Sequence, residues 1–203
     1  MSIIKYILNM KRLLCFQISH FLFQKIRIIK YNILSNCFFV KGKPQYNSPA
    51  LLTGNGKVIF EGIVNLGTKS SPFFYNSYIY IEARNLNSII KIEDGVWINN
   101  NATIISEGEG IHIGKDTLIG FNFSVFDSDF HNISPFKRND GSQKTSAVII
   151  KSNVFIGSNV TILKGVIIGE NTVIASGSVV TKSIPSNVVA GGNPCKIIKN
   201  IAL

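Results

Sequence analysis

One polar stretch, between residues 126 and 148, holds the side chains best suited to acid–base chemistry. His131 lies within it, and Asp127 and Asp129 precede that histidine by four and two residues. A neutral imidazole, with an ordinary pKa of about 6.5, can take a proton from a hydroxyl group near neutral pH. A carboxylate that accepts the ring N–H would fix the tautomer and stabilise the imidazolium. The same residue types also occur in surface loops whose turns are made by Asp, so both interpretations stay open.

The elements that must position this stretch are specified by a period of six residues. Over residues 149–184 the first position of each hexad is always Ile or Val, and the fourth is Asn, Gly or Ser. Three hexads make one three-sided coil, with aliphatic residues pointing inward and Asn or Gly turning the corners. The same phase occurs earlier in two further runs, at Ile92, Ile98 and Ile104 and at Ile113, Ile119 and Val125.

Two interruptions of the repeat predict irregular features. Nine residues separate Ile104 from Ile113, so three extra residues around Gly108–Gly110 should bulge from a corner. The repeat also stops at residue 126 and resumes at 148, which predicts a protruding loop. We therefore expect an all-β domain over residues 46–203, a parallel β-helix with a loop at 126–148.

The first 45 residues have a different composition. Residues 1–45 contain eight Lys or Arg and no Asp or Glu, whereas residues 46–203 carry a net charge of only +2. Such a basic, apolar segment could lie on an anionic membrane surface, or it could pack on the main body or on a neighbouring subunit. Apolar residues recur here at steps of three and four, which predicts a short amphipathic helical extension: Ile3, Ile4, Ile7, Leu8, Leu14, Ile18, Phe21 and Leu22.

Several classes of protein do not fit this sequence. The apolar part of the first segment is shorter than the ~20 residues of a membrane span and has no small-residue cleavage site after it. The basic excess lies outside the expected folded body, so we expect no nucleic-acid partner. The three cysteines stand at unrelated spacings, at Cys15, Cys37 and Cys195. This pattern predicts neither a disulfide framework nor a metal site. We expect three reduced thiols, which are typical of a cytoplasmic protein.

The hexads and the segment that follows them resemble the hexapeptide-repeat acyltransferases over about Ile92–Ile198. The ending Gly191-Gly-Asn-Pro-Cys-Lys is similar to that of the galactoside and maltose acetyltransferases, and Asp127-Ser-Asp-Phe-His is similar to the polysaccharide O-acetyltransferases. The resemblance implies that the β-helix is left-handed, although ordinary parallel crossovers are right-handed. It also implies a cytoplasmic homotrimer, with peripheral inner-membrane contact through residues 1–45 as one option.

By the same resemblance, the protein is an acetyl-CoA-dependent O-acetyltransferase acting on a sugar hydroxyl of a cell-surface polysaccharide or its precursor. Acetyl-CoA would be the acyl donor, no metal would take part, and His131 would be the general base. Two alternatives stay open, an N-acetyltransferase for a nucleotide-linked amino sugar and a non-catalytic β-helix scaffold. The intact segment Gly191–Lys196 argues against a scaffold, which has no need of a nucleotide site.

The resemblance also implies roles for individual residues. Asn101 would lie near the acetyl group and donate to the developing oxyanion, unless it only turns a corner. Asp127 and Asp129 would orient His131, form turns or hold hydroxyls of the acceptor. Residues expected to bind CoA, in a groove between neighbouring β-helices, comprise an aromatic and two serines at the pantetheine arm and polar residues at the nucleotide and its phosphates: Phe155, Ser158, Ser176, Thr181, Lys182, Lys196 and Lys199.

Overall fold

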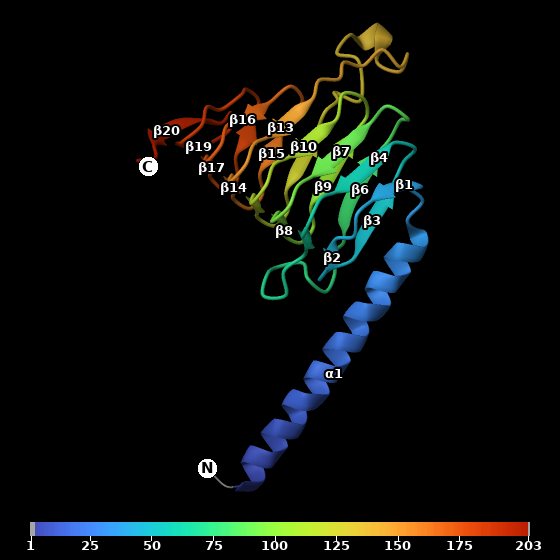
Figure 1. Ribbon diagram of the computed structural model, residues 1–203, viewed down its shortest axis with the longest axis vertical. Helices are drawn as coiled ribbons and strands as arrows, with labels where there is room; N and C mark the ends of the chain where they lie inside the picture. The colour runs from blue at the N-terminus through green and yellow to red at the C-terminus, as the bar shows by residue number, and fades with distance from the viewer. Residues whose placement is uncertain (1–2, 203) are drawn as a thin grey trace.

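A computed structural model of the protein describes residues 3–202, except for side chains of residues 3–9, 13, 14, 16–18 and 20. A long helix, α1 (Ile3–Leu34), precedes a body of short stacked strands (Figure 1). The expected helix is therefore present, but it is longer than a short extension. No Gly or Pro interrupts the chain before Gly42, so nothing in the local sequence stops the helix early.

The strands form three sheets, which we name the first, second and third sheets. The first sheet contains, in order, β1 (Phe39–Lys41), β4 (Lys57–Phe60), β7 (Ile89–Ile92), β10 (Ile111–Ile113), β13 (Val148–Ile150) and β16 (Ile167–Ile168). The second contains β2 (Gln45–Tyr46), β5 (Asn65–Leu66), β8 (Trp97–Ile98), β11 (Leu118–Ile119), β14 (Phe155–Ile156), β17 (Val173–Ile174), β19 (Val188–Gly191) and β20 (Lys196–Asn200). The third contains β3 (Ala50–Thr53), β6 (Ile79–Ala83), β9 (Thr103–Ser106), β12 (Ser124–Phe126), β15 (Thr161–Ile162) and β18 (Val179–Val180).

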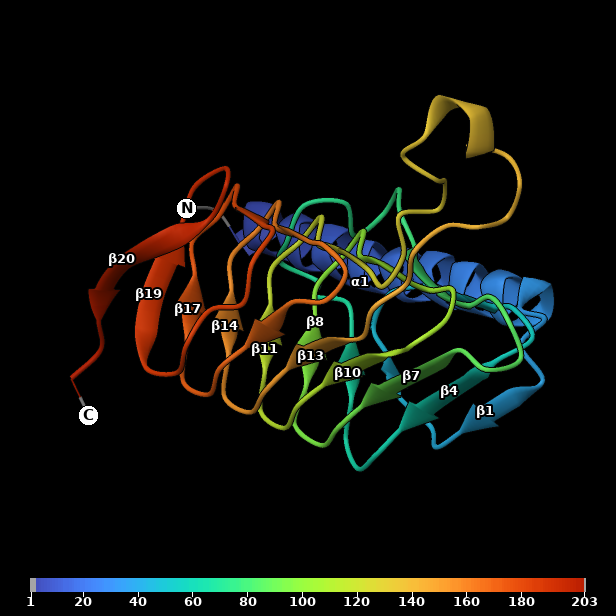
Figure 2. The same cartoon turned by 90° about the horizontal axis from the view of Figure 1, so that it is seen from above.

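The chain visits the three sheets in turn, so each coil adds one strand to each sheet. We call this stack of coils, with its three sheets, the prism. Almost every pairing is parallel and joins strands that occupy the same place in successive coils, as Figure 2 shows. The exception among the described strands is the antiparallel pair of β19 and β20 at the end of the second sheet. Strands begin at Phe39, so the sheets start before residue 46.

The core is the column of aliphatic residues that the period of six predicts. Ile98, Ile119, Ile156 and Ile174 stack in register along the second sheet, and the hexad-first residues are all buried. This prediction from the sequence is confirmed. Burial of each such side chain contributes roughly 1.5–3 kcal/mol to folding, so the column is the main source of stability.

The corners follow the prediction too. Asn153, Asn159 and Asn171 have φ angles of 55°, 58° and 57°, in the left-handed region where Asn and Gly are best tolerated. Their side chains also bond between coils. The Asn153 amide donates to Asn171 at 2.9 Å, and the Asn171 amide donates to Asn187 at 2.8 Å. We call the row of Asn153, Asn171 and Asn187 the asparagine ladder.

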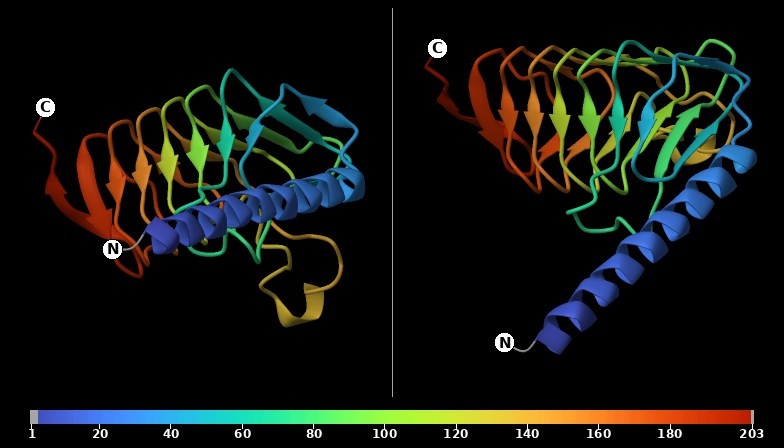
Figure 3. Two further views of the ribbon diagram at one scale, coloured as in Figure 1. Left: turned by 90° about the horizontal axis from the view of Figure 1, so that it is seen from below. Right: turned by 60° about the horizontal axis from the view of Figure 1, so that its bottom comes forward.

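Helix α1 is fastened to the body by polar side chains near its C-terminal end. Gln24 Nε2 donates to the carbonyl oxygens of Asn47 and Phe74, and Arg27 Nη1 donates to that of Phe74 at 2.7 Å. The N-terminal half of the helix extends beyond the body (Figure 3). In the part of the chain that is described, no helix has the length and apolarity needed to cross a bilayer.

Candidate active site

The segment between β12 and β13 leaves the prism at the corner between the third and first sheets (Figure 2). An isolated bridge between Ser128 and Thr145 closes its base, and a short 3-10 helix, η1 (Pro135–Lys137), lies near its tip. The two chain segments at the base thus hold each other, while the tip is exposed. We call this segment the active-site loop.

His131 is an exposed residue of the active-site loop, with its ring held by the backbone. Its Nδ1 lies 3.0 Å from the carbonyl oxygen of Arg138. A carbonyl oxygen can only accept, so Nδ1 is the donor in this contact, and in a neutral ring the lone pair is then on Nε2. That tautomer is the one a general base needs when Nε2 faces the proton to be removed.

Asp127 is fully buried and bonds to the bulge after β9 rather than to His131. Its carboxylate accepts from the amides of Glu107 at 2.6 Å and Gly110 at 2.8 Å, and from Ser106 Oγ at 2.7 Å. The three extra residues between Ile104 and Ile113 leave these amides outside the regular ladder, and the carboxylate satisfies them. The orienting partner of the His131 ring in this structure is therefore a backbone carbonyl and not Asp127.

Asp129 points to a different set of partners. Its carboxylate lies 3.4 Å from Lys164 Nζ, a residue of the next coil. Asp129 also lines a small cavity of about 120 Å³ with Asn132, Ile133 and Lys144. A carboxylate, an amide and an ammonium group around one cavity can both accept from and donate to the hydroxyls of a ligand.

Asn101 is a corner residue. Its φ is 60°, and its amide donates to Asn122 Oδ1 at 3.0 Å. The Asn122 amide in turn donates to Asn159 Oδ1 at 2.8 Å, so these residues form a second row between coils. This arrangement accounts for an Asn at position 101 without any role in chemistry.

The residues expected at the pantetheine arm of CoA lie together. Phe155 is on the outer face of the second sheet, half exposed, between Leu118 and Val173 of the neighbouring strands. Ser158 and Ser176 follow at the corner between the second and third sheets, where Ser176 Oγ accepts from the Ser158 amide at 3.1 Å. These serines are 18 residues apart in the sequence, which is one coil of three hexads, so the spacing itself predicts that they stack.

The residues expected at the nucleotide lie near the C-terminal end of the prism. Thr181 and Lys182 follow β18, and Lys196 and Lys199 are on β20; all four are exposed. Within one chain, His131 and the pantetheine group of residues therefore belong to different corners of the prism.

A network that sequence reasoning missed lies at the base of the active-site loop. Arg84 makes two hydrogen bonds to Glu82, at 2.9 and 3.0 Å, and one to Glu107 at 3.2 Å. Burial by itself raises the pKa of the Glu82 carboxyl, but hydrogen bonds from Arg84 and Tyr80 outweigh it, so that pKa lies below its ordinary value. None of Glu82, Arg84 and Glu107 belongs to a hexad pattern. Glu107 comes close to the other two only because β6 and β9 stack.

No cluster of three or more His, Cys, Asp or Glu suited to a metal ion occurs among the residues that the structure describes.

Comparison with known proteins identifies the family. Residues 147–182 match the model "Bacterial transferase hexapeptide (six repeats)". The chain is 36% identical to the putative acetyltransferase YJL218W of Saccharomyces cerevisiae over 177 residues, which are 87% of this chain and 80% of the yeast protein. It is 41% identical to a galactoside O-acetyltransferase of Lactococcus lactis over 107 residues, which are 53% of this chain and about half (51%) of that relative's length.

Comparison with solved structures supports the same family. The polySia-specific acetyltransferase NeuO is similar with a TM-score of 0.57 and 29% identity, over 81% of this chain and 83% of that one. Galactoside acetyltransferase in complex with coenzyme A is similar with a TM-score of 0.50 and 25% identity, over 81% of this chain and 65% of that one. With its hexads, its stacked parallel sheets and this extent of identity, the chain belongs to the hexapeptide-repeat acetyltransferases.

Proposed function

We propose that this protein is an O-acetyltransferase that moves the acetyl group of acetyl-CoA to a sugar hydroxyl of a cell-surface polysaccharide or its precursor. Relatives named for galactoside and polySia, and a relative solved with coenzyme A, support this function. The observation that carries it is the 3.0 Å contact between His131 Nδ1 and the carbonyl oxygen of Arg138, which in a neutral ring leaves the lone pair on Nε2.

In the proposed mechanism, Nε2 of His131 takes the proton from the acceptor hydroxyl as its oxygen attacks the thioester carbonyl. The tetrahedral intermediate then collapses, the C–S bond breaks, and the imidazolium returns the proton to the leaving CoA thiolate. No acyl-enzyme is needed, because the thioester is already activated. Asp129 and the small cavity beside it would hold hydroxyls of the acceptor. Asn101 is a weaker candidate for the oxyanion, since it bonds to Asn122.

The proposal includes a homotrimer of left-handed prisms. CoA would lie between two protomers, with Phe155, Ser158 and Ser176 along its arm and Thr181, Lys182, Lys196 and Lys199 at its nucleotide. His131 of one protomer would face CoA bound against the next. The different corners that these groups occupy within one chain support this arrangement. Residues 46–203 would be the acyltransferase domain, in the cytoplasm, and residues 1–45 a segment that contacts the inner membrane.

The test measures acetyl transfer with labelled acetyl-CoA and a panel of acceptors, detected by mass spectrometry. We expect ester-linked acetyl on a saccharide, and a fall in kcat of about 10²–10⁴-fold in His131→Asn. The matched control is His112→Asn, since His112 pairs with Glu93 on the first sheet at 2.8 Å. Transfer to an amine but not to hydroxyls would contradict the proposal. So would full activity in His131→Asn.

A further inference from the structure

Helix α1 turns two polar side chains, Gln24 and Arg27, toward the protein and a row of aliphatic side chains away from it. Gln24 is 6% exposed and Arg27 is partly buried, and both bond to backbone carbonyls of the body. Tyr31, one turn on, stacks on Tyr78 with ring centroids 4.5 Å apart. Polar anchors thus occupy the side on which an ordinary surface helix buries aliphatic residues.

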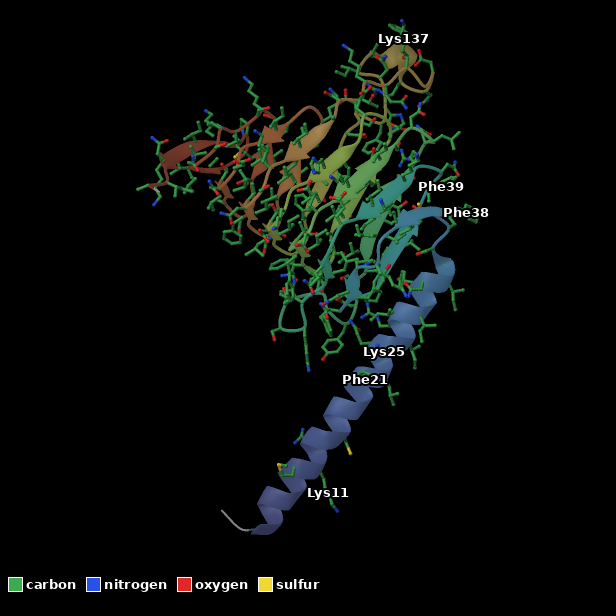
Figure 4. All side chains as sticks on the ribbon, in the orientation of Figure 1. Lys11, Phe21, Lys25, Phe38, Phe39 and Lys137 are labelled. Carbon is green, nitrogen blue, oxygen red and sulfur yellow. The ribbon has the colours of Figure 1, made fainter. Side chains whose placement is uncertain are left out.

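The opposite side of the helix is an aliphatic row. Leu22, Ile26, Ile29 and Ile33 are spaced by four, three and four residues, so they lie on one face, and they are 54–77% exposed. We call these four residues the outward row. Past the end of the helix, Phe38 and Phe39 are exposed as well, and Figure 4 labels both near the C-terminal end of α1. Exposed apolar side chains gathered on one face of a helix mark an interaction site.

Charge identifies the class of partner. Exposed cations of α1 accompany the row, among them Lys11, Lys25 and Lys30, and residues 1–45 contain no carboxylate side chain. A second copy would bring the same cations to the contact, and its body, residues 46–203, carries a net charge of +2. The complementary partner is therefore anionic as well as apolar, as the headgroups and acyl chains of an acidic bilayer are.

We propose that the outward row, with Phe38 and Phe39, is a docking surface for an anionic phospholipid bilayer, on which α1 lies in the plane of the interface. This inference deepens the membrane contact of the proposed function by naming the face. Aliphatic side chains would enter the acyl boundary, while lysines beside them meet the headgroups. The polar anchors Gln24 and Arg27 would keep the body attached to the docked helix.

The experiment is flotation of the full chain with vesicles of phosphatidylcholine and phosphatidylglycerol at three to one, and with phosphatidylcholine alone. We expect binding to the anionic vesicles that weakens as salt is raised. In Ile26→Ser/Ile29→Ser/Ile33→Ser, binding should fall at least tenfold. The control Ile63→Ser/Leu86→Ser changes exposed aliphatic residues of the body instead, and it should bind as the parent protein does.

Circular dichroism and acetyl transfer to a soluble saccharide report folding and activity separately from vesicle binding. Equal binding by the row variant and the parent protein overturns the proposal. The proposal is also overturned if the parent protein does not bind vesicles and the row variant has a smaller native mass than the parent. The outward row would then be a contact between copies of the chain. Loss of transfer in the parent protein is a failure of the proposed function alone, since vesicle binding needs no catalysis.

A second inference rests on a different observation, the backbone of Phe130 next to His131. Phe130 has a φ of 60°, in the left-handed region that a bulky aromatic residue seldom adopts. Such a conformation is unfavourable for a residue of this kind and persists only when the surroundings hold it. Both its ring and its amide are held. The ring meets Phe126 edge-on with centroids 5.5 Å apart, and the amide donates to Ser128 Oγ at 2.9 Å.

Arg84 links these two restraints. Its guanidinium carbon lies 5.1 Å from the centroid of the Phe130 ring, a cation–π contact. Its hydrogen bonds run to Glu82 and to Glu107, and Glu107 also accepts from Ser128 Oγ. The network therefore reaches Phe130 by its ring and by its amide.

We infer that Arg84 is a positioning residue, which holds Phe130 in its left-handed conformation and so sets the direction of His131. This inference rests on the proposed role of His131. Arg84 itself lies at the base of the loop and is not expected to touch the substrate. A lysine could supply the positive charge at this position but not the two simultaneous hydrogen bonds that the guanidinium makes to Glu82.

In Arg84→Gln we expect kcat to fall about tenfold or more, while the KM for acetyl-CoA stays within twofold. Arg84→Lys should recover part of that loss. The control Lys91→Gln also removes a cation paired with two carboxylates, Glu61 and Glu93, but on the first sheet and without contact to Phe130. Unchanged kcat in folded Arg84→Gln overturns the inference, and so does an equal fall in the control.

A second readout does not depend on catalysis. The imidazole signals of His131 in a proton–nitrogen NMR spectrum should shift in Arg84→Gln and stay in place in Lys91→Gln. Unmoved signals in Arg84→Gln overturn the inference even where the parent protein proves inactive.

Discussion

At the residue scale, Asp127 and His131 stand four positions apart in one polar stretch but meet opposite environments. His131 is exposed and bonds to one carbonyl, whereas the Asp127 carboxylate is enclosed by the amides of the bulge after β9. A buried carboxylate with several N–H donors is a structural element in its own right, since those amides have no other described acceptor. Substitutions at these two positions should therefore have different effects on the stability and the activity of the protein.

Asp127→Asn should destabilise the protein. The amide oxygen can replace one carboxylate oxygen, but the NH₂ group would face backbone donors, so the free energy of unfolding should fall by roughly 2–4 kcal/mol. Urea denaturation followed by circular dichroism measures this, with His131→Asn as a control of parental stability. A variant at position 127 that is as stable as the parent but inactive would instead mean that Asp127 acts on the chemistry.

Glu82 predicts a pH dependence of stability. Its folded pKa is lowered, so the ionised carboxylate stabilises the fold above its unfolded pKa, about 4.3, and that contribution disappears as the pH falls through the folded value. Glu82→Gln should therefore be about 1–3 kcal/mol less stable than the parent at pH 7, and the difference should shrink toward pH 3. Denaturation curves at both pH values measure it. A difference that grows in acid would refute this assignment.

At the element scale, strands of two to five residues are too short to be stable alone, so each depends on the corners that place it over the coil below. The asparagine ladder does this at one corner. Asn171, its middle member, combines a left-handed backbone with an amide that donates to Asn187 and accepts from Asn153. The backbone conformation is local to the residue, whereas the hydrogen bonds form only between stacked coils.

Asn171→Ala should lower the free energy of unfolding by roughly 2–3 kcal/mol, because it loses two hydrogen bonds and strains a φ of 57°. Asn171→Gly keeps the backbone relaxed and should lose less. Thermal unfolding of both variants separates the two effects. If alanine and glycine cost the same, the left-handed backbone has no part in the stability of this corner.

At the scale of the whole molecule, the outer face of the second sheet carries a column of large apolar residues. Trp97, Leu118 and Phe155 are in register on adjacent strands and are 39–51% exposed. We expect this column to face the neighbouring protomer of the proposed trimer, because the proposed CoA site is shared by two protomers and the column borders the corner of Ser158. An apolar column between copies would be covered in the trimer and exposed only in a single chain.

Leu118→Lys should therefore convert the trimer to monomers and abolish transfer, since the charge would be buried without a partner. Light scattering coupled to size exclusion should change from three times the 22.4 kDa chain mass to a single one. Leu86→Lys, at an exposed corner, is the control and should stay trimeric. A trimeric, active Leu118→Lys would place the interface elsewhere.

The sequence by itself determined the prism. A period of six is a local pattern, and so is the left-handed preference of Asn and Gly, so the buried column and the corners at Asn153, Asn159 and Asn171 could be predicted from residues alone. It also indicated the active-site loop and the stacking of Ser158 on Ser176, because the interruption and the spacing of whole coils are visible in the chain.

Only the tertiary structure decided which partners the loop residues have. The bonds of Asp127 to the bulge, the carbonyl of Arg138 on His131 and the contact of Arg84 with Phe130 join residues 7 to 46 positions apart, and they depend on how side chains point after the coils are stacked. The direction of α1 is of the same kind. Periodicity identifies an apolar face, but which face meets the body depends on the carbonyls of Asn47 and Phe74, which become acceptors only once the prism has formed.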